Sequence, residues 1–129
     1  MNRMALLSLA LVIGCQDKVS GLPAGFRSFE LTTVAEGVSG SAAISDEEGS
    51  TSSVAVTLRG VTLGQVYAGR IVSGTCSNPG TVSANLNSVT ASTTSVQART
   101  SSVPDSVLTA GHAIAYLRGS TTVACGNIN

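Results

Sequence analysis

The chain is poor in several residue types that common functions require. It has no tryptophan, two tyrosines, two phenylalanines and one histidine, and its seven basic residues balance its seven acidic ones. Nucleic-acid binding needs a basic surface and, for single strands, aromatic side chains on which bases stack, so we expect no nucleic-acid partner. A single histidine, His112, also excludes a metal site built from several imidazoles.

Long hydrophobic runs are missing as well. The apolar run at 4–14 is broken only by Ser8 and would form a helix of about 16 Å, roughly half the thickness of a bilayer core. Arg3 precedes this run and small residues follow it, which is the pattern of an export signal and not of a membrane-spanning anchor. The residues after it have the length of one domain.

The export signal ends in a specific motif. Val12, Ile13, Gly14 and Cys15 resemble the lipobox of bacterial lipoprotein signal peptides, in which the chain is cut before the cysteine and a diacylglycerol is attached to its thiol. The resemblance implies a signal peptide at 1–14 and lipid on Cys15. The alternative is an ordinary secretory signal with an incidental cysteine, but such signals prefer small residues at both the first and third positions before the cut.

Lipid on Cys15 would make the membrane a partner of this chain. Each buried methylene contributes about 0.8 kcal/mol, so several acyl chains together would hold the chain firmly. Residues 15–27 are then a lipidated tether, because 16–25 are polar and contain Gly and Pro, and 28–129 are the domain. In lipoproteins an aspartate directly after the cysteine favours the inner membrane. Here Gln16 takes that place, which implies the outer membrane of a bacterial cell envelope.

Two cysteines remain once Cys15 is assigned to lipid. An even pair in an exported domain is most simply a disulfide, here between Cys76 and Cys125. Closing a loop of this length would stabilise the fold by about 4 kcal/mol in the chain-entropy account. Two buried thiols are the alternative, which export disfavours. A redox-active pair is disfavoured further, because neither cysteine has CxxC spacing or begins a helix.

The body of the chain predicts an all-β fold. Short β-prone runs alternate with breaks rich in Gly, Asn, Pro and Asp, and eight such runs favour an antiparallel Greek-key sandwich or flattened barrel. Serine and threonine, which are abundant, suit the solvated outer face of such a fold. The segment 102–109 has room for one helical turn. We expect strands at 28–34, 38–45, 52–59, 66–73, 84–91, 94–100, 112–118 and 121–125.

Period-two alternation assigns side chains to the two faces of these strands. In 52–59, Val54, Val56 and Leu58 share one face. In 66–73, Ala68, Arg70 and Val72 share the face opposite Tyr67 and Ile71. In 112–118, Ala113, Ala115 and Leu117 share the face opposite Ile114 and Tyr116.

Two segments carry a resemblance to a known family. Residues 67–76 (YAGRIVSGTC) and 110–128 (AGHAIAYLRGSTTVACGNI) resemble the small copper/zinc superoxide dismutase-like and CHRD-like β-sandwich domains of bacterial exported proteins. The resemblance extends from about residue 29 to residue 128, and its most specific parts are the GTC and ACGNI segments. It implies a disulfide that joins a loop at Cys76 to the last strand at Cys125, in agreement with the pairing argued above.

The resemblance fails at the metal ligands. The family has His-x-His just before the Gly-Thr-Cys segment, where this chain has Arg70 and Val72, and a further histidine where it has Leu117. Valine and leucine carry no donor atoms, and arginine stays protonated and repels cations. We therefore expect the scaffold without a metal or any other cofactor. We also expect Val72 and Leu117 to pack together while Arg70 reaches solvent.

Two other features suggest chemistry but have simpler explanations. His112 has no Cys, Asp or Glu near it in the sequence, so we interpret it as structural and not as a ligand or general base. Asp46, Glu47 and Glu48 could bind Ca²⁺ weakly, but they lie in a predicted turn, which favours a solvated loop. The GxSxG elbow of a serine nucleophile is absent from the sequence.

These observations predict a non-catalytic, lipid-anchored module of the cell envelope with a structural or binding role. The alternative is a superoxide dismutase-type enzyme or a copper-handling protein whose metal site has moved, although one histidine and two oxidised cysteines cannot supply four donors. A third possibility is assembly with another envelope protein, through an edge strand or through the apolar surface of the former metal site.

Overall fold

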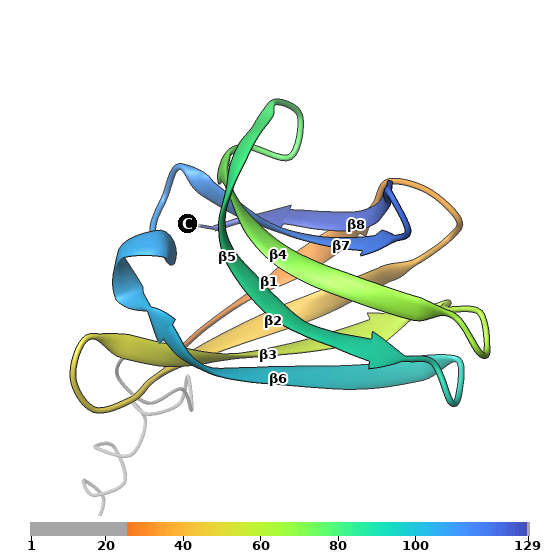
Figure 1. The fold of residues 1–129 in the computed structure, drawn as a ribbon, viewed down its shortest axis with the longest axis horizontal. Helices are drawn as coiled ribbons and strands as arrows, with labels where there is room; N and C mark the ends of the chain where they lie inside the picture. Colours follow the sequence, from red (N-terminus) through yellow and green to blue (C-terminus); the bar gives the residue numbers. More distant parts are fainter. Residues whose placement is uncertain (1–25, 129) are drawn as a thin grey trace, which may run out of the picture.

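The computed structural model describes residues 26–128, which form eight antiparallel strands and one short 3₁₀ turn (Figure 1). The expected signal peptide, Cys15 and the tether up to residue 25 lie outside the described residues. No helix within 26–128 is long and apolar enough to cross a membrane. The elements are β1 (Phe26–Thr33), β2 (Ser39–Asp46), β3 (Thr51–Arg59), β4 (Val66–Gly74), β5 (Pro79–Thr90), β6 (Ser95–Pro104), η3 (Asp105–Val107), β7 (His112–Arg118) and β8 (Thr121–Asn127).

The strands form one nearly closed sheet in the order β5-β4-β7-β8-β1-β2-β3-β6. β1 belongs to both halves of this barrel, because residues 26–31 pair with β2 while Thr32 and Thr33 pair with β8. β6 lies beside β3 and β7 lies beside β4, so the β3–β4 and β6–β7 connections cross between the two halves. This is Greek-key connectivity. The predicted antiparallel flattened barrel is confirmed.

The barrel closes between β5 and β6 through side chains. Asn87 of β5 donates its backbone N–H to the Thr100 hydroxyl at 2.8 Å and its side-chain amide to the Arg99 carbonyl at 2.7 Å. From inside the barrel, Tyr116 donates its hydroxyl to the Asn87 carbonyl at 3.2 Å. These side-chain contacts replace the backbone ladder that joins the other neighbouring strands.

The core is built from the inward faces that alternation predicts. Val54, Val56 and Leu58 are each 1% exposed, and the tyrosines of β4 and β7 are fully buried with them. Buried hydroxyls need polar partners. The Tyr67 oxygen accepts the Thr62 N–H at 2.9 Å, and Tyr116 bonds to β5 as described above. Burial raises the pKa of Tyr116 to about 12.

The strand bounds differ most from the expected ones in β5 and β6. β7 has the predicted bounds, and η3 is a single helical turn within 102–109, where one had room to form. β1 begins two residues early, at Phe26, β5 begins at Pro79 instead of residue 84, and β6 continues to Pro104 instead of ending at residue 100. The β4–β5 register shifts at three places, two of them between Ile71 and Gly74. Beyond these shifts the end of β4, the loop at 75–78 and the start of β5 project from the barrel, and we refer to them as the β4–β5 arm (Figure 1). Its polar residues and glycines have the composition of a loop.

An ion pair fixes the turn between β1 and β2. Glu36 and Gly37 both adopt left-handed backbone conformations, at φ 60° and 72°. Arg118, at the end of β7, donates two hydrogen bonds of 2.6 Å to the Glu36 carboxylate. These bonds and the charge of Arg118 lower the pKa of the Glu36 carboxyl group. The pair holds the β1–β2 turn against the barrel.

Candidate functional site

The outer faces of β4, β7 and β8 carry an apolar cluster that is separate from the barrel core. Outward-facing residues of an antiparallel barrel are ordinarily polar. Here five residues on the outside of the sheet are apolar, and each of them is at most 7% exposed. We refer to Val72, Ala113, Ala115, Leu117 and Cys125, with Cys76 packed against them, as the outer cluster.

Strand register determines how the outer cluster is arranged. Arg70 of β4 pairs with Ala115 of β7, which pairs with Cys125 of β8, so these three residues form one row across the sheet. Val72 lies in the row on one side of it and Leu117 in the row on the other. The rows of Val72 and Leu117 are four residues apart, or about 13 Å along a strand. The Ala115 row thus lies between Val72 and Leu117, although both side chains belong to the outer cluster.

A groove of about 390 Å³ opens over this cluster. Ala115 is small, and it leaves space between its two neighbours in the central row. The groove brings together the three positions singled out from the sequence, Arg70, Val72 and Leu117. Its other lining residues come from β1–β2, the β4–β5 arm and β8, and they are Val34, Cys76, Pro79, Gly80, Val82, Thr122 and Cys125.

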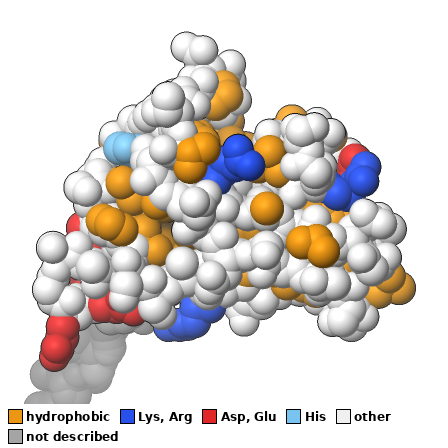
Figure 2. Space-filling view, in the orientation of Figure 1, with side chains coloured by type: hydrophobic (Ala, Val, Ile, Leu, Met, Phe, Trp, Pro, Cys, Tyr) orange, Lys and Arg blue, Asp and Glu red, His pale blue; other side chains and the backbone are white. Residues whose placement is uncertain are grey.

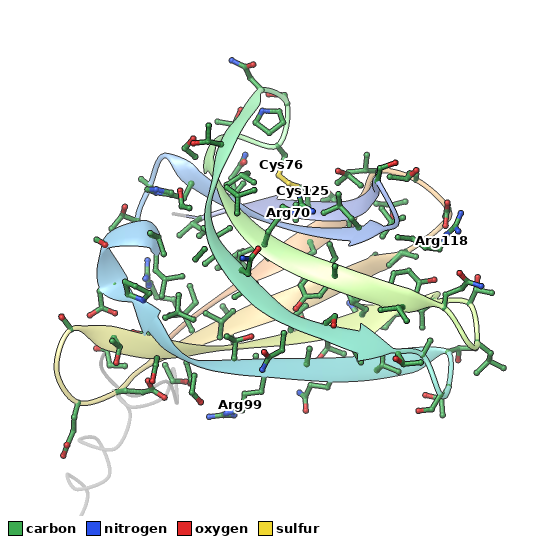
Figure 3. The ribbon with its side chains drawn as sticks, in the orientation of Figure 1. Arg70, Cys76, Arg99, Arg118 and Cys125 are labelled. Carbon is green, nitrogen blue, oxygen red and sulfur yellow. A yellow bond between two sulfur atoms is a disulfide. The ribbon has the colours of Figure 1, made fainter. Side chains whose placement is uncertain are left out.

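The disulfide borders this groove. Cys76 and Cys125 are bonded, with their Cα atoms 5.9 Å apart, and Figure 3 labels both cysteines next to Arg70, whose row contains Cys125. The backbone N–H of Cys76 also donates a 2.8 Å hydrogen bond to the side chain of Asn127. The pairing of Cys76 with Cys125 is confirmed. It attaches the loop between β4 and β5 to β8, the last strand.

Arg70 differs from the other arginines of the described region. It is half-buried in the groove, and no acceptor among residues 26–128 contacts its guanidinium group. Each of the others has a partner: Arg118 pairs with Glu36, Arg59 lies 3.9 Å from Glu30, Arg99 contacts the Ser53 hydroxyl at 3.4 Å, and Arg27 donates to the Leu108 carbonyl at 2.8 Å. Arg70 is thus a cation without a counter-charge inside an apolar groove.

The groove does not fit copper or zinc. Its two sulfur atoms are bonded to each other, its one charged group is a cation, and valine and leucine offer no donor atoms. In the part of the chain that the structure describes, no three His, Cys, Asp or Glu side chains gather closely enough to hold a metal ion.

His112 and the acidic cluster have structural partners. The His112 Nδ1 atom lies 3.3 Å from the Thr109 carbonyl and 3.4 Å from the Thr109 hydroxyl, in the turn that precedes β7. Glu47 accepts hydrogen bonds from the Thr51 hydroxyl and the Ser102 N–H. Its carboxylate thereby fixes the β2–β3 turn against β6.

One polar contact was not anticipated from the sequence. The hydroxyl of Ser52, which is 1% exposed, lies 2.6 Å from an oxygen of Asp105 and 3.2 Å from an oxygen of Asp46. These contacts join the beginning of β3 to η3. A long-range contact of this kind leaves no local signal in the sequence.

Comparison of the chain with family models, curated proteins and solved structures found no match. Fold and site together define an all-β Greek-key barrel with an external apolar groove that contains one unpaired cation.

Proposed function

We propose that this protein is a non-catalytic, lipid-anchored module of the bacterial cell envelope with a binding role. The observation that carries the proposal is the composition of the groove, which combines apolar walls, a disulfide and one guanidinium group. None of these groups acts as a nucleophile, a general base or a metal ligand. A disulfide is also typical of proteins exported to an oxidising compartment, which agrees with the lipobox at 12–15.

Lipid attachment is tested at Cys15. The full chain is expressed in bacteria fed with labelled palmitate, beside the Cys15→Ser variant and a Cys76→Ser variant as control. We expect label on the unmodified chain and on Cys76→Ser, and none on Cys15→Ser, because only Cys15 occupies the lipobox position. Electrophoresis and membrane fractionation provide the readout. Equal labelling of Cys15→Ser would show that the lipobox interpretation is wrong.

Metal binding separates the proposed role from the alternative, a superoxide dismutase-type or copper-handling protein. The purified chain, with its disulfide intact, is exposed to copper and zinc salts, passed over a chelating column and analysed by mass spectrometry for bound metal. We expect metal far below one equivalent, because the groove offers no donor set. One equivalent of copper that survives the column would overturn the proposed role, and an assay of dismutase activity would then distinguish an enzyme from a copper-handling protein.

A further inference from the structure

The charge of Arg70 sits in unusual surroundings. Arg70 as a residue is half-buried, its guanidinium group makes no polar contact within residues 26–128, and apolar side chains line the groove around it. Figure 3 labels Arg70 beside β4, and Figure 2 shows basic and hydrophobic side chains next to one another on this face of the molecule. A half-buried charge costs free energy unless it is paired, and a bound anion would supply the missing partner.

The walls of the groove also present apolar surface to solvent. Val34 is 55% exposed and Val82 is 46% exposed, and both line the groove. Val72 and Leu117 lie deeper, at 6% and 7% exposure. An apolar chain placed along these side chains would remove the outer valines from water, and about 25 cal/mol is gained for each Å² of apolar surface buried.

We propose that this groove binds a medium-chain fatty carboxylate, with its carboxylate on the guanidinium group of Arg70 and its acyl chain along the outer cluster. This inference names the ligand class for the binding role proposed above, and it rests on that role. Thr122 lines the same groove, and its hydroxyl would be the second hydrogen-bond donor to the head group.

Charge and polarity select this ligand class over others. One guanidinium group balances one negative charge and matches a carboxylate in a two-bond geometry. The side-chain polar groups of the lining are Arg70 and Thr122, so most amides of a bound peptide would stay unpaired there, at a cost in free energy. A volume of about 390 Å³ is at the lower end for small-molecule sites, which suits one short acyl chain.

The site is tested by photolabelling. The full chain in lipid nanodiscs is exposed to an octanoate that carries a diazirine in its tail, irradiated and digested, and the adducts are located by mass spectrometry. We expect adducts in peptides that contain residues 70–82 or 115–125. Unlabelled octanoate should abolish them, whereas octanol, which lacks the charge, should leave them.

Variants test the role of the guanidinium group. Arg70→Gln should reduce labelling at least about tenfold, since hydrogen bonds to charged groups are the strong ones. Arg70→Lys keeps the charge but loses the two-bond geometry, so it should fall between Arg70→Gln and the unmodified chain. Arg99→Gln removes a cation on β6, outside the groove lining, and should change nothing. Thermal unfolding and the intact disulfide mass establish that each variant folds.

Chain length supplies a second, independent readout. Competition should strengthen from butanoate to hexanoate to octanoate, by up to about fourfold for each added methylene, and acetate should have little effect. Equal competition by acetate and octanoate would contradict an acyl site. Adducts that persist in a folded Arg70→Gln chain, competition by octanol, or crosslinks between two copies of the chain through this groove would also overturn the proposal. Palmitate labelling and metal content test the proposed function, and photolabelling tests the fatty-carboxylate site. Failure of the one is therefore distinguishable from failure of the other.

Discussion

Removal of the disulfide is expected to lower the free energy of unfolding by about 2–5 kcal/mol. The bond between Cys76 and Cys125 spans 49 residues, so reduction releases a large loop in the unfolded chain. It also detaches the β4–β5 arm from β8, where one hydrogen bond from Cys76 to Asn127 would remain. The measurement is urea unfolding of the unmodified chain and of the double variant Cys76→Ala, Cys125→Ala.

A matched treatment separates the effect of losing the disulfide bond from the effect of replacing the two cysteine side chains. The unmodified chain in excess dithiothreitol keeps both sulfur atoms but loses the bond between them, so its unfolding midpoint should fall nearly as far as that of the double variant. Alanine is preferred to serine because Cys125 is 4% exposed, and a serine hydroxyl there would add a cost of its own. An unchanged midpoint after verified reduction would show that the bond does not stabilise the fold.

Replacement of Gly69 by alanine is expected to destabilise the barrel by about 3 kcal/mol. Gly69 of β4 faces the core and pairs with Tyr116 of β7. A Cβ atom at Gly69 would lie 2.6 Å from the Tyr116 hydroxyl oxygen and 2.7 Å from its Cε1 atom, well inside contact distance. The ring has little room to move, because it is 1% exposed and its hydroxyl bonds to Asn87.

A double-mutant cycle tests the cause of that loss. In a Tyr116→Leu background the ring is gone. Adding Gly69→Ala to that variant should lower its free energy of unfolding by only about 1 kcal/mol. Tyr116→Leu lowers stability by itself, and the quantity of interest is the difference between the two costs of the alanine. Chemical denaturation of all four chains provides the values. Equal costs in both backgrounds would show that the ring does not exclude a side chain at position 69.

Much of the fold could be predicted from short-range patterns. Alternation identified the core faces of β3 and β7. In β3 the period of two is unbroken from Val54 to Leu58, and in β7 successive side chains belong in turn to the outer cluster and to the core. The extent of β5 could not be predicted. The β4–β5 register shifts between Ile71 and Gly74, and such irregularities depend on how two strands meet and not on the composition of either.

The candidate site was predicted in part. Alternation put Arg70 and Val72 on one face of their strand and Leu117 on one face of its own. The family resemblance, and not alternation, grouped the three positions at one site, and the structure has all three around one groove. The contributions of Val34 and Val82 could not be predicted, because they depend on the β1–β2 turn and on the projecting arm. The apolar outer face of β7 did leave a signal, since alanines and leucine alternate there with the core residues of the same strand.

The closure between β5 and β6 has a mechanical consequence. Elsewhere around the circumference, two neighbouring strands can separate only if a ladder of backbone hydrogen bonds breaks. Along this line, the bonds made by Asn87 and Tyr116 take the place of a ladder. Widening of the barrel would therefore begin at this line, and the wall that carries Arg70 would swing outward with β4 and β5 while their own pairing stays intact.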